Sequence, residues 1–363
     1  GCAMIFMKVI EGSGALDALS SLIIEKFHRF PAVLLVLIML IIMFPGMITG
    51  SSTAAVLSAG SIMAPVLALM GIDAVTSGSI IAMGALLGMI APPVNTAALI
   101  ICAGIDVPYV GFEGPLALIT FPLAILFVLL LGYKQARHMD YEKLKPALEK
   151  QDAIRKQYGV RIYIPLLVLV GLMVIFKVLK LGEDIGMPLM FLISAAVGLF
   201  TGKKINVLTA VPEAIRTAAP VMGILMGVGM FIEVMTATGV RGLVVISCLR
   251  LPSTLWLLAC AISIPLFGAV SSYGACSVLG VPFAYIYASL LGGNSVVVLA
   301  AISLIAAVGD MMPPTALAGL FAAQVTGVEK YTKILKRCIV PIIILLVYAC
   351  FFLANSKLIA GLF

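Results

Sequence analysis

Stretches of about 20 predominantly apolar residues recur along the whole chain, and they strongly limit the folds available to it. Examples are the segments 32–48, 115–133 and 162–181. A helix needs about 20 apolar residues to cross the hydrocarbon layer of a membrane. Because the runs are continuous and do not alternate with polar positions, they favour helices over the strands of an outer-membrane barrel. The sequence therefore predicts an all-α polytopic membrane protein.

Composition excludes the main alternatives. Hydrophobic residues make up 63% of the 363 residues and charged residues only 11%, too few charges to cover a soluble domain and too many apolar residues for a disordered chain. The net charge of +7 comes from basic residues in loops, which is typical of membrane topology signals and not of nucleic-acid binding. The cysteines are scattered, and both histidines lie in charged loops. We therefore expect a lipid bilayer as the surroundings, no nucleic-acid partner and no resident cofactor.

Prolines and serines recur in the same order in two halves of the chain. The matching positions, at offsets between 220 and 225 residues, are Pro31 with Pro252, Pro45 with Pro265, Ser51-Ser52 with Ser271-Ser272, and Pro92-Pro93 with Pro313-Pro314. Such an ordered set predicts two structural repeats, residues 1–133 and 162–363, joined by a linker at 134–161. The first repeat is expected to be N-terminally truncated, with further residues before Gly1.

The charge distribution predicts how the two repeats are oriented. The linker contains eight Lys or Arg and four Asp or Glu, which favours a cytoplasmic location. When the spans are followed in both directions from the linker, the clusters of basic residues fall on the cytoplasmic side only if the segments 32–70 and 254–290 each enter and leave the membrane on the same face. The two repeats then have inverted topology, the architecture of many secondary transporters.

Each repeat is therefore predicted to contain a re-entrant helical hairpin, at 32–70 and at 254–290. The tips read FPGMITGSSTAAV (44–56) and PLFGAVSSYGACSV (265–278). Ser and Thr are good N-caps for the returning helix, and Gly permits the tight bend.

Each repeat is also predicted to contain a transmembrane helix broken by a proline pair, at 76–103 and at 293–325. Two adjacent prolines remove hydrogen bonds and interrupt the helix. Non-helical backbone survives at membrane depth only where protein or a cavity satisfies it. The freed carbonyls, together with Asn95, Thr96 and Thr315, offer hard oxygen ligands suited to Na⁺, and the helix N-termini can hold an anion.

Asp310 and Lys8 are two of the charged side chains that fall within apolar segments. Asp310 precedes the second proline pair, and an intramembrane carboxylate is a candidate functional group. It would coordinate a cation or carry a coupling proton; alternatively, it is a neutral carboxyl capped by freed backbone. Lys8 is predicted to be a snorkelling topology signal.

The segments ITGSSTAAVLSAGSIMAPVLALMGI, LLGMIAPPVNTA and AVGDMMPPTALAG resemble the large membrane subunit of the tripartite ATP-independent periplasmic (TRAP) transporters, within the ion-transporter superfamily. The resemblance implies an elevator mechanism in the bacterial cytoplasmic (inner) membrane, driven by a sodium gradient. It also implies a periplasmic binding protein that delivers a small organic anion, such as a C4-dicarboxylate, a sialic acid or a related carboxylate, and a small four-helix membrane subunit.

The same resemblance implies two binding regions, one in each repeat. The first comprises Gly50, Ser51, Ser52 and Thr53 with Pro92, Pro93, Asn95 and Thr96, and the second comprises Ser271, Ser272 and Tyr273 with Pro313, Pro314 and Thr315. Sodium is expected at Ser51, Ser52 and Asn95, and again at Ser271, Ser272 and Thr315. Asp310 is added to these as a candidate ion-binding residue.

The sequence leaves alternatives open. The first proline pair is followed by Val94 and Asn95 where the family usually has Ser, and the second reads MPPTA. A stand-alone carrier of the same superfamily, with proton coupling through Asp310, is the main alternative, and a channel is less favoured. An enzyme is not expected, because no H-E-x-x-H motif, G-x-S-G motif or pair of membrane carboxylates is present.

Overall fold

The computed structural model describes residues 2–137, 153–178, 187–252 and 255–363, and no strand occurs among them. Five described helices are long and apolar enough to cross a membrane: Pro31–Thr49, Ser52–Leu69, Glu113–Ala136, Ala153–Ile175 and Tyr331–Ala354. The all-α membrane fold class predicted from the sequence is confirmed. Part of the predicted linker, residues 138–152, lies outside the described residues.

The first part of the chain forms a short series of helices with two interruptions. Its elements are α1 (Cys2–Ser13), α2 (Ala15–Phe27), α3 (Pro31–Thr49), α4 (Ser52–Ala55), the π-helix η1 (Val56–Gly60), α5 (Ser61–Leu69), α6 (Ala74–Ile90), α7 (Thr96–Gly104) and α8 (Glu113–Ala136). The chain leaves helical geometry between α3 and α4, and again between α6 and α7.

The second part begins with three elements before the same order of helices recurs. Its elements are η2 (Gly159–Tyr163), α10 (Ile164–Val178), α11 (Met187–Thr201), α12 (Val207–Ala237), α13 (Val240–Leu249), α14 (Trp256–Gly268), α15 (Ser272–Ala275), η5 (Cys276–Gly280), α16 (Val281–Ala284), η6 (Tyr285–Leu290), α17 (Ser295–Ala307), η7 (Val308–Met311), α18 (Leu317–Thr326), α19 (Tyr331–Ala354) and α20 (Ser356–Ala360). A π-helix follows α15 as it follows α4. The inverted membrane orientation of the two halves stays a prediction.

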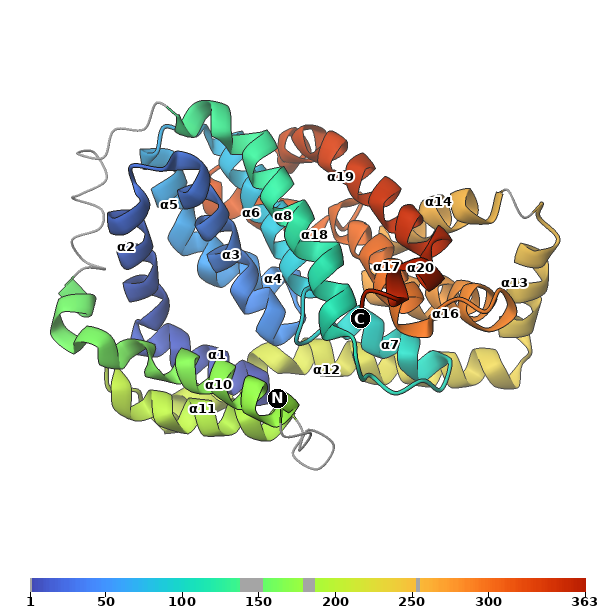
Figure 1. Cartoon of the computed structure of the whole chain (residues 1–363), viewed down its shortest axis with the longest axis horizontal. Coiled ribbons are helices and arrows are strands. Elements are labelled where there is room, and N and C mark those ends of the chain that lie inside the picture. Colours follow the sequence, from blue (N-terminus) through green and yellow to red (C-terminus); the bar gives the residue numbers. More distant parts are fainter. Residues whose placement is uncertain (1, 138–152, 179–186, 253–254) are drawn as a thin grey trace.

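The helices form a lower layer and a larger group that contains both hairpins. Helices α1, α10, α11 and α12 lie along the lower edge of the view in Figure 1, with α1 in contact with α11 and α12. Helices α3, α6 and α8 pack together in the centre, and α14, α16, α17 and α19 lie to the right. Helix α2 connects the lower group to α3. The arrangement sets the two hairpins against a separate layer of helices.

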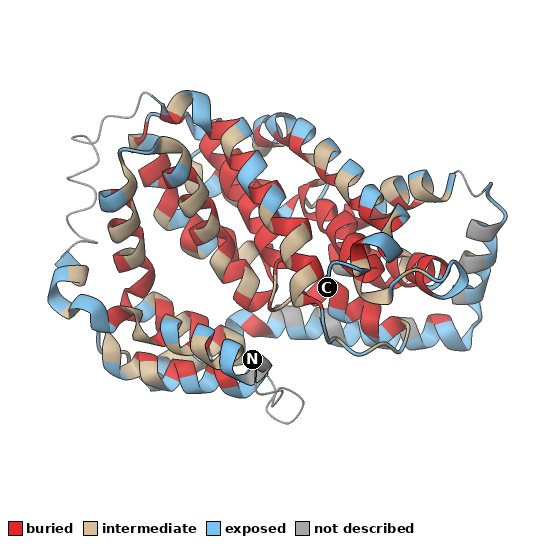
Figure 2. Ribbon diagram, in the orientation of Figure 1, coloured by how far each residue is buried: buried red, intermediate tan, exposed pale blue. Residues whose placement is uncertain are grey.

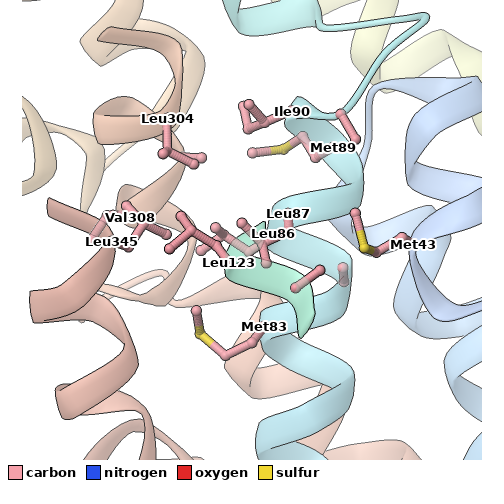
Figure 3. Packing of buried hydrophobic residues seen from close by; sticks show 14 of the residues in the cluster. Met43, Met83, Leu86, Leu87, Met89, Ile90, Leu123, Leu304, Val308 and Leu345 are labelled. Atoms are coloured by element: carbon pink, nitrogen blue, oxygen red, sulfur yellow. The ribbon is translucent and has the colours of Figure 1, made fainter. Parts of the chain in front are cut away.

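The core lies where α6 and α17 meet, one from each half of the chain. Every residue from Thr76 to Ile90 and from Val297 to Ala307 is buried, and Figure 2 shows the buried positions concentrated in these central helices. Figure 3 shows side chains of both halves packed around α6; those labelled are Met43, Met83, Leu86, Leu87, Met89, Ile90, Leu123, Leu304, Val308 and Leu345. The main apolar core is therefore shared by the two halves.

The N-terminus of α6 is fixed by a polar cluster outside the apolar segment. Asp73 accepts a hydrogen bond from the Thr76 amide (2.9 Å) and another from Gln135 Nε2 of α8 (2.6 Å). Burial by itself would raise the pKa of Asp73, but these hydrogen bonds and the charge of Arg337 outweigh it and hold the pKa below its usual value. The ionised carboxylate thus caps α6 and ties it to α8.

In each half, the first hairpin helix approaches the broken helix so closely that only glycine fits. A Cβ at Gly88 would lie 2.5 Å from the backbone oxygen of Met43, and a Cβ at Gly46 would lie 2.8 Å from the Gly88 carbonyl carbon. In the second half, a Cβ at Gly309 would lie 2.6 Å from the Gly268 Cα. Close backbone packing through small residues is a common way to join membrane helices.

We predict that Gly88→Ala lowers the apparent melting temperature of the purified protein, because the added methyl group meets backbone and cannot be accommodated by a side-chain rotation. Overpacking of this kind costs about 1–3 kcal/mol. Gly171→Ala is the matched control: it lies in α10, where no described atom is within 4 Å of the added Cβ, and alanine favours a helix by up to about 1 kcal/mol. Equal melting temperatures for the two variants would contradict the close contact.

Candidate functional site

The returning helix of each hairpin tip is capped in the same way. Helix α3 ends at Gly50, whose backbone is left-handed (φ 67°), and Ser51 then caps α4 by accepting a hydrogen bond from the Ala54 amide (3.3 Å). In the second tip, Ser271 accepts the corresponding bond from the Gly274 amide (3.1 Å). The first serine of each pair therefore caps the returning helix.

The second serine of each pair meets the same carboxylate. Ser52 Oγ donates a hydrogen bond to Asp310 Oδ2, and the Ser272 side chain is also a hydrogen-bonding neighbour of Asp310. Asp310 lies on η7, just before the second proline pair, and is only 5% exposed. One buried acidic group thus connects the two tips, although Ser52 and Asp310 are 258 residues apart in the sequence.

A cavity of about 720 Å³ lies between these tips and the helices α1 and α12. Its polar and charged lining comprises Lys8, Glu11, Thr49, Ser51, Ser52, Thr53, Ser58, Ser61, Thr217, Ser271, Ser272, Asp310 and Thr315. Ligand pockets typically occupy about 300–1,000 Å³. The cavity therefore has room for a small organic molecule, and most of its polar groups are hydroxyls.

Lys8 and Glu11 contribute the other charges of the cavity. Both come from α1, and their side chains form an ion pair at 3.1 Å with 32% and 26% of their surfaces exposed. Lys8 was expected to be a topology signal, whereas the structure places it on the cavity wall. Its position within the apolar segment MIFMKVI was the signal available in the sequence, because a charge inside an apolar helix is a functional-site candidate.

The first break is closed by hydrogen bonds within the protein. Asn95 is fully buried; its Oδ1 accepts from the Ala98 amide (2.9 Å), and its Nδ2 donates to Ser303 Oγ of α17 (2.8 Å). The Tyr109 hydroxyl donates to the Pro93 carbonyl and accepts from the Asn95 amide, each at 3.2 Å. These groups lie away from the cavity lining.

The second break is more open to the cavity. Thr315 Oγ1 and the Thr315 amide both donate to the Ala269 carbonyl, at 2.7 Å and 3.3 Å. In the first half, the Val94 amide makes the corresponding bond to the Met47 carbonyl (3.2 Å). Both proline pairs are joined by cis peptide bonds. Each break is thus held by the end of its own hairpin helix.

The family model for "Tripartite ATP-independent periplasmic transporter, DctM component" matches residues 3–356. The chain belongs to this family. No curated protein matches the chain. The resemblance to the large membrane subunit of TRAP transporters is therefore confirmed, and the protein is a subunit of a secondary transporter.

The structure of this DctM component divides the predicted site residues into two sets. Those that line the cavity are Ser51, Ser52, Thr53, Ser271, Ser272, Asp310 and Thr315; those that do not are Gly50, Pro92, Pro93, Asn95, Thr96, Pro313 and Pro314. The side chain of Tyr273 lies outside the described part of the structure. Among the described residues, no group of three His, Cys, Asp or Glu side chains forms a metal site, so a cation here would be held by hydroxyls, carbonyls and the single carboxylate.

We predict that Asn95→Ala destabilises this DctM component more than Asn294→Ala does. Both asparagines cap a helix, since Asn294 Oδ1 accepts from the Val297 amide (3.1 Å). Loss of a cap costs about 0.5–2 kcal/mol. Asn95→Ala also breaks the buried bond to Ser303, which adds roughly 1 kcal/mol. Thermal unfolding in potassium chloride, without sodium, measures both. Equal losses would show that the Asn95–Ser303 bond contributes nothing to stability.

Proposed function

We propose that this DctM component moves a small organic anion across the bacterial cytoplasmic membrane, driven by a sodium gradient, by an elevator movement of the two hairpins and the two broken helices. The anion is a C4-dicarboxylate, a sialic acid or a related carboxylate. The observation that carries the proposal is the convergence of both hairpin tips, Asp310 and Lys8 on one cavity. The family supports a transporter; the substrate, the ion and the movement are our inference.

The cavity suits an anion. The ammonium group of Lys8 faces the same space as the hydroxyls of both tips, and hydrogen bonds between a charged group and its partner are about twice as strong as neutral ones. The Glu11 carboxylate lies 3.1 Å from the Lys8 ammonium group. A substrate carboxylate would therefore either replace Glu11 as the partner of Lys8 or share Lys8 with it. We infer that Lys8 supplies the positive charge that no arginine provides.

The tips also suit a cation. We retain Ser51, Ser52, Ser271, Ser272 and Thr315 as proposed sodium ligands, with Asp310 beside them. Unwound backbone and hydroxyl oxygens at helix breaks are the usual ligands of Na⁺ in transporters with inverted repeats. For Asn95, the bonds to Ala98 and Ser303 favour a structural role.

The elevator movement is supported by how the hairpins are attached. Each hairpin helix bonds to its own break, through Met47 and Ala269, and packs against the broken helix through paired glycines. Helix α1 packs mainly against α11 and α12 and less extensively against α3. Hairpins and broken helices would then move as one body past a fixed layer.

The partners implied by the family are a small four-helix membrane subunit and a periplasmic binding protein. Exposed apolar side chains along α12, including Met222, Met226, Met230 and Val234, provide a surface that lipid or the small subunit would cover. A stand-alone carrier coupled to protons is the second candidate function, and the specific observation that favours it is the buried carboxylate of Asp310.

We predict that replacing KCl by NaCl at constant ionic strength raises the apparent melting temperature of the purified protein in a saturable way. A ligand that binds only the native state stabilises it by mass action, by about 2.7 kcal/mol at a concentration 100 times the Kd. Replacing KCl by choline chloride is the control and should leave the melting temperature unchanged. An identical melting curve in NaCl and KCl would argue against sodium coupling.

We also predict that Lys8→Gln raises the KM for transport in proteoliposomes that contain the whole complex. Losing a hydrogen bond to a charged group costs about 1.5–3 kcal/mol, which corresponds to a rise of about 10- to 100-fold. Lys134→Gln, near the end of α8 and away from the cavity lining, is the matched control. A normal KM in Lys8→Gln would remove Lys8 from the binding site.

A further inference from the structure

A cluster of basic side chains lies at the beginning of α19, far along the chain from the tips. All four are exposed, and none forms an ion pair with another described residue: Lys330, Lys333, Lys336 and Arg337. The charge of Arg337 also acts on Asp73, at the start of α6. Asp73 and Glu329 are the acidic side chains nearest to the cluster in these two segments. The basic cluster therefore keeps an excess of positive charge that suits an anionic ligand.

A second cavity, of about 230 Å³, lies between the end of α5, the beginning of α6 and the end of α18. Most of its lining is small and apolar: Ala64, Pro65, Ala68, Ala74 and Val325. Pro65, Ala68 and Ala74 are exposed, so the cavity opens to the surroundings of the protein. It is separate from the larger cavity between the hairpin tips, with which it shares no lining residue.

The two hydroxyl groups that line this small cavity are already engaged as donors. Ser77 Oγ donates to the Ile72 carbonyl (3.4 Å), and Thr326 Oγ1 donates to the Ala322 carbonyl (2.7 Å). Both bonds stay close to their own helix and leave no hydroxyl proton for a polar ligand. The small cavity therefore suits an apolar group.

The packing of three helices brings the basic cluster and the small cavity together. A Cβ at Gly78 of α6 would lie 2.5 Å from Ile334 Cδ1 and 3.0 Å from Thr326 Oγ1, so α6, α18 and α19 meet beside the cavity. Lys333 is next to Ile334, and Lys330 and Arg337 lie about one helical turn to either side of it. Helix α19 begins at the upper edge of the view in Figure 1. Charge and apolar cavity thus belong to one region of the surface.

We propose that this region binds one anionic phospholipid, with its phosphate at the basic cluster and part of an acyl chain in the small cavity. The charge distribution of the sequence predicts that the cluster lies on the cytoplasmic side, where anionic lipids attract basic residues and basic pockets between membrane helices bind their head groups. The proposal does not depend on the transported substrate or on the coupling ion. A lipid bound here would connect α5 of the first hairpin with α18 of the second half.

Basic residues beside a span are also expected as topology signals, and lipid binding separates the two roles. We would measure binding of phosphatidylglycerol, and of phosphatidylcholine with the same acyl chains, to the purified full chain by native mass spectrometry. We expect one tightly bound phosphatidylglycerol at concentrations where phosphatidylcholine does not bind. The double variant Lys330→Gln/Lys333→Gln should raise the Kd for phosphatidylglycerol about 10- to 30-fold, because each basic residue contributes about fivefold.

The matched control is Lys203→Gln/Lys204→Gln. It removes the same charge from two exposed lysines between α11 and α12, which are predicted on the same side of the membrane, and should bind phosphatidylglycerol as the wild type does. Equal binding of the two lipids, or an equal loss in both double variants, would overturn the site and leave the lysines as topology signals alone.

Ala68→Phe tests the small cavity, because the added ring would occupy it. We expect the Kd for phosphatidylglycerol to rise about tenfold, as for two methylene groups of the acyl chain that are no longer buried. Ala237→Phe is the control, at an exposed position near the end of α12. Melting curves without added lipid confirm that the variants are folded.

Two further results would contradict the proposal. Unchanged binding in Ala68→Phe would exclude the small cavity as the place of the acyl chain. Displacement of phosphatidylglycerol by an equal concentration of glycerol 3-phosphate would show that the region recognises a soluble phosphate compound and not a lipid.

Discussion

Backbone groups that leave helical geometry inside an apolar protein must find partners within the protein, and this constraint organises both halves of the chain. In each half the amide just after the proline pair donates to the last carbonyls of the hairpin helix: Val94 to Met47 and Thr315 to Ala269. These bonds require the hairpin and the broken helix to lie in contact, which the paired glycines permit. A break therefore does more than expose carbonyls. It also fixes the hairpin tip beside the cavity, so the hairpin and the broken helix must move together.

The two halves use different side chains to satisfy the backbone groups at their helix breaks. In the first, Asn95 and Tyr109 satisfy the break from within the protein, and Asn95 reaches Ser303 of the other half. In the second, Thr315 is the main polar support and Asp310 precedes the prolines. Met89 occupies the position in α6 that corresponds to Asp310. A repeated backbone thus carries different side chains at matching positions.

Much of the fold could be predicted from the sequence because helix-length apolar runs, prolines and N-capping serines are local signals. Predicted spans such as 32–48 and 115–133 correspond closely to α3 (Pro31–Thr49) and α8 (Glu113–Ala136). The contacts of the site could not be predicted in this way, since Ser52 and Asp310 are 258 residues apart and Asn95 and Ser303 are 208 apart. The sequence predicted Asn95 as a sodium ligand, but local pattern does not separate this role from helix capping, because an asparagine before a helix is suited to both. The place of Lys8 on the cavity wall could not be predicted from the sequence, because the cavity exists only once α1 is packed beside the tips.

The division of charges between the two groups of helices gives a physical reason for coupling. Lys8 and Glu11 belong to α1, which packs with α11 and α12, whereas Asp310 belongs to the elements around the hairpins. In an elevator movement, an anion in the cavity would leave Lys8 behind and would travel with Asp310. Two negative groups would then share one apolar environment, which is strongly unfavourable without a compensating charge. A cation bound beside Asp310 would remove that barrier, because it would neutralise the carboxylate. If the proposed elevator movement takes place, a carboxylate on the moving part and a lysine on the fixed part would make transport of the proposed anion depend on a cation.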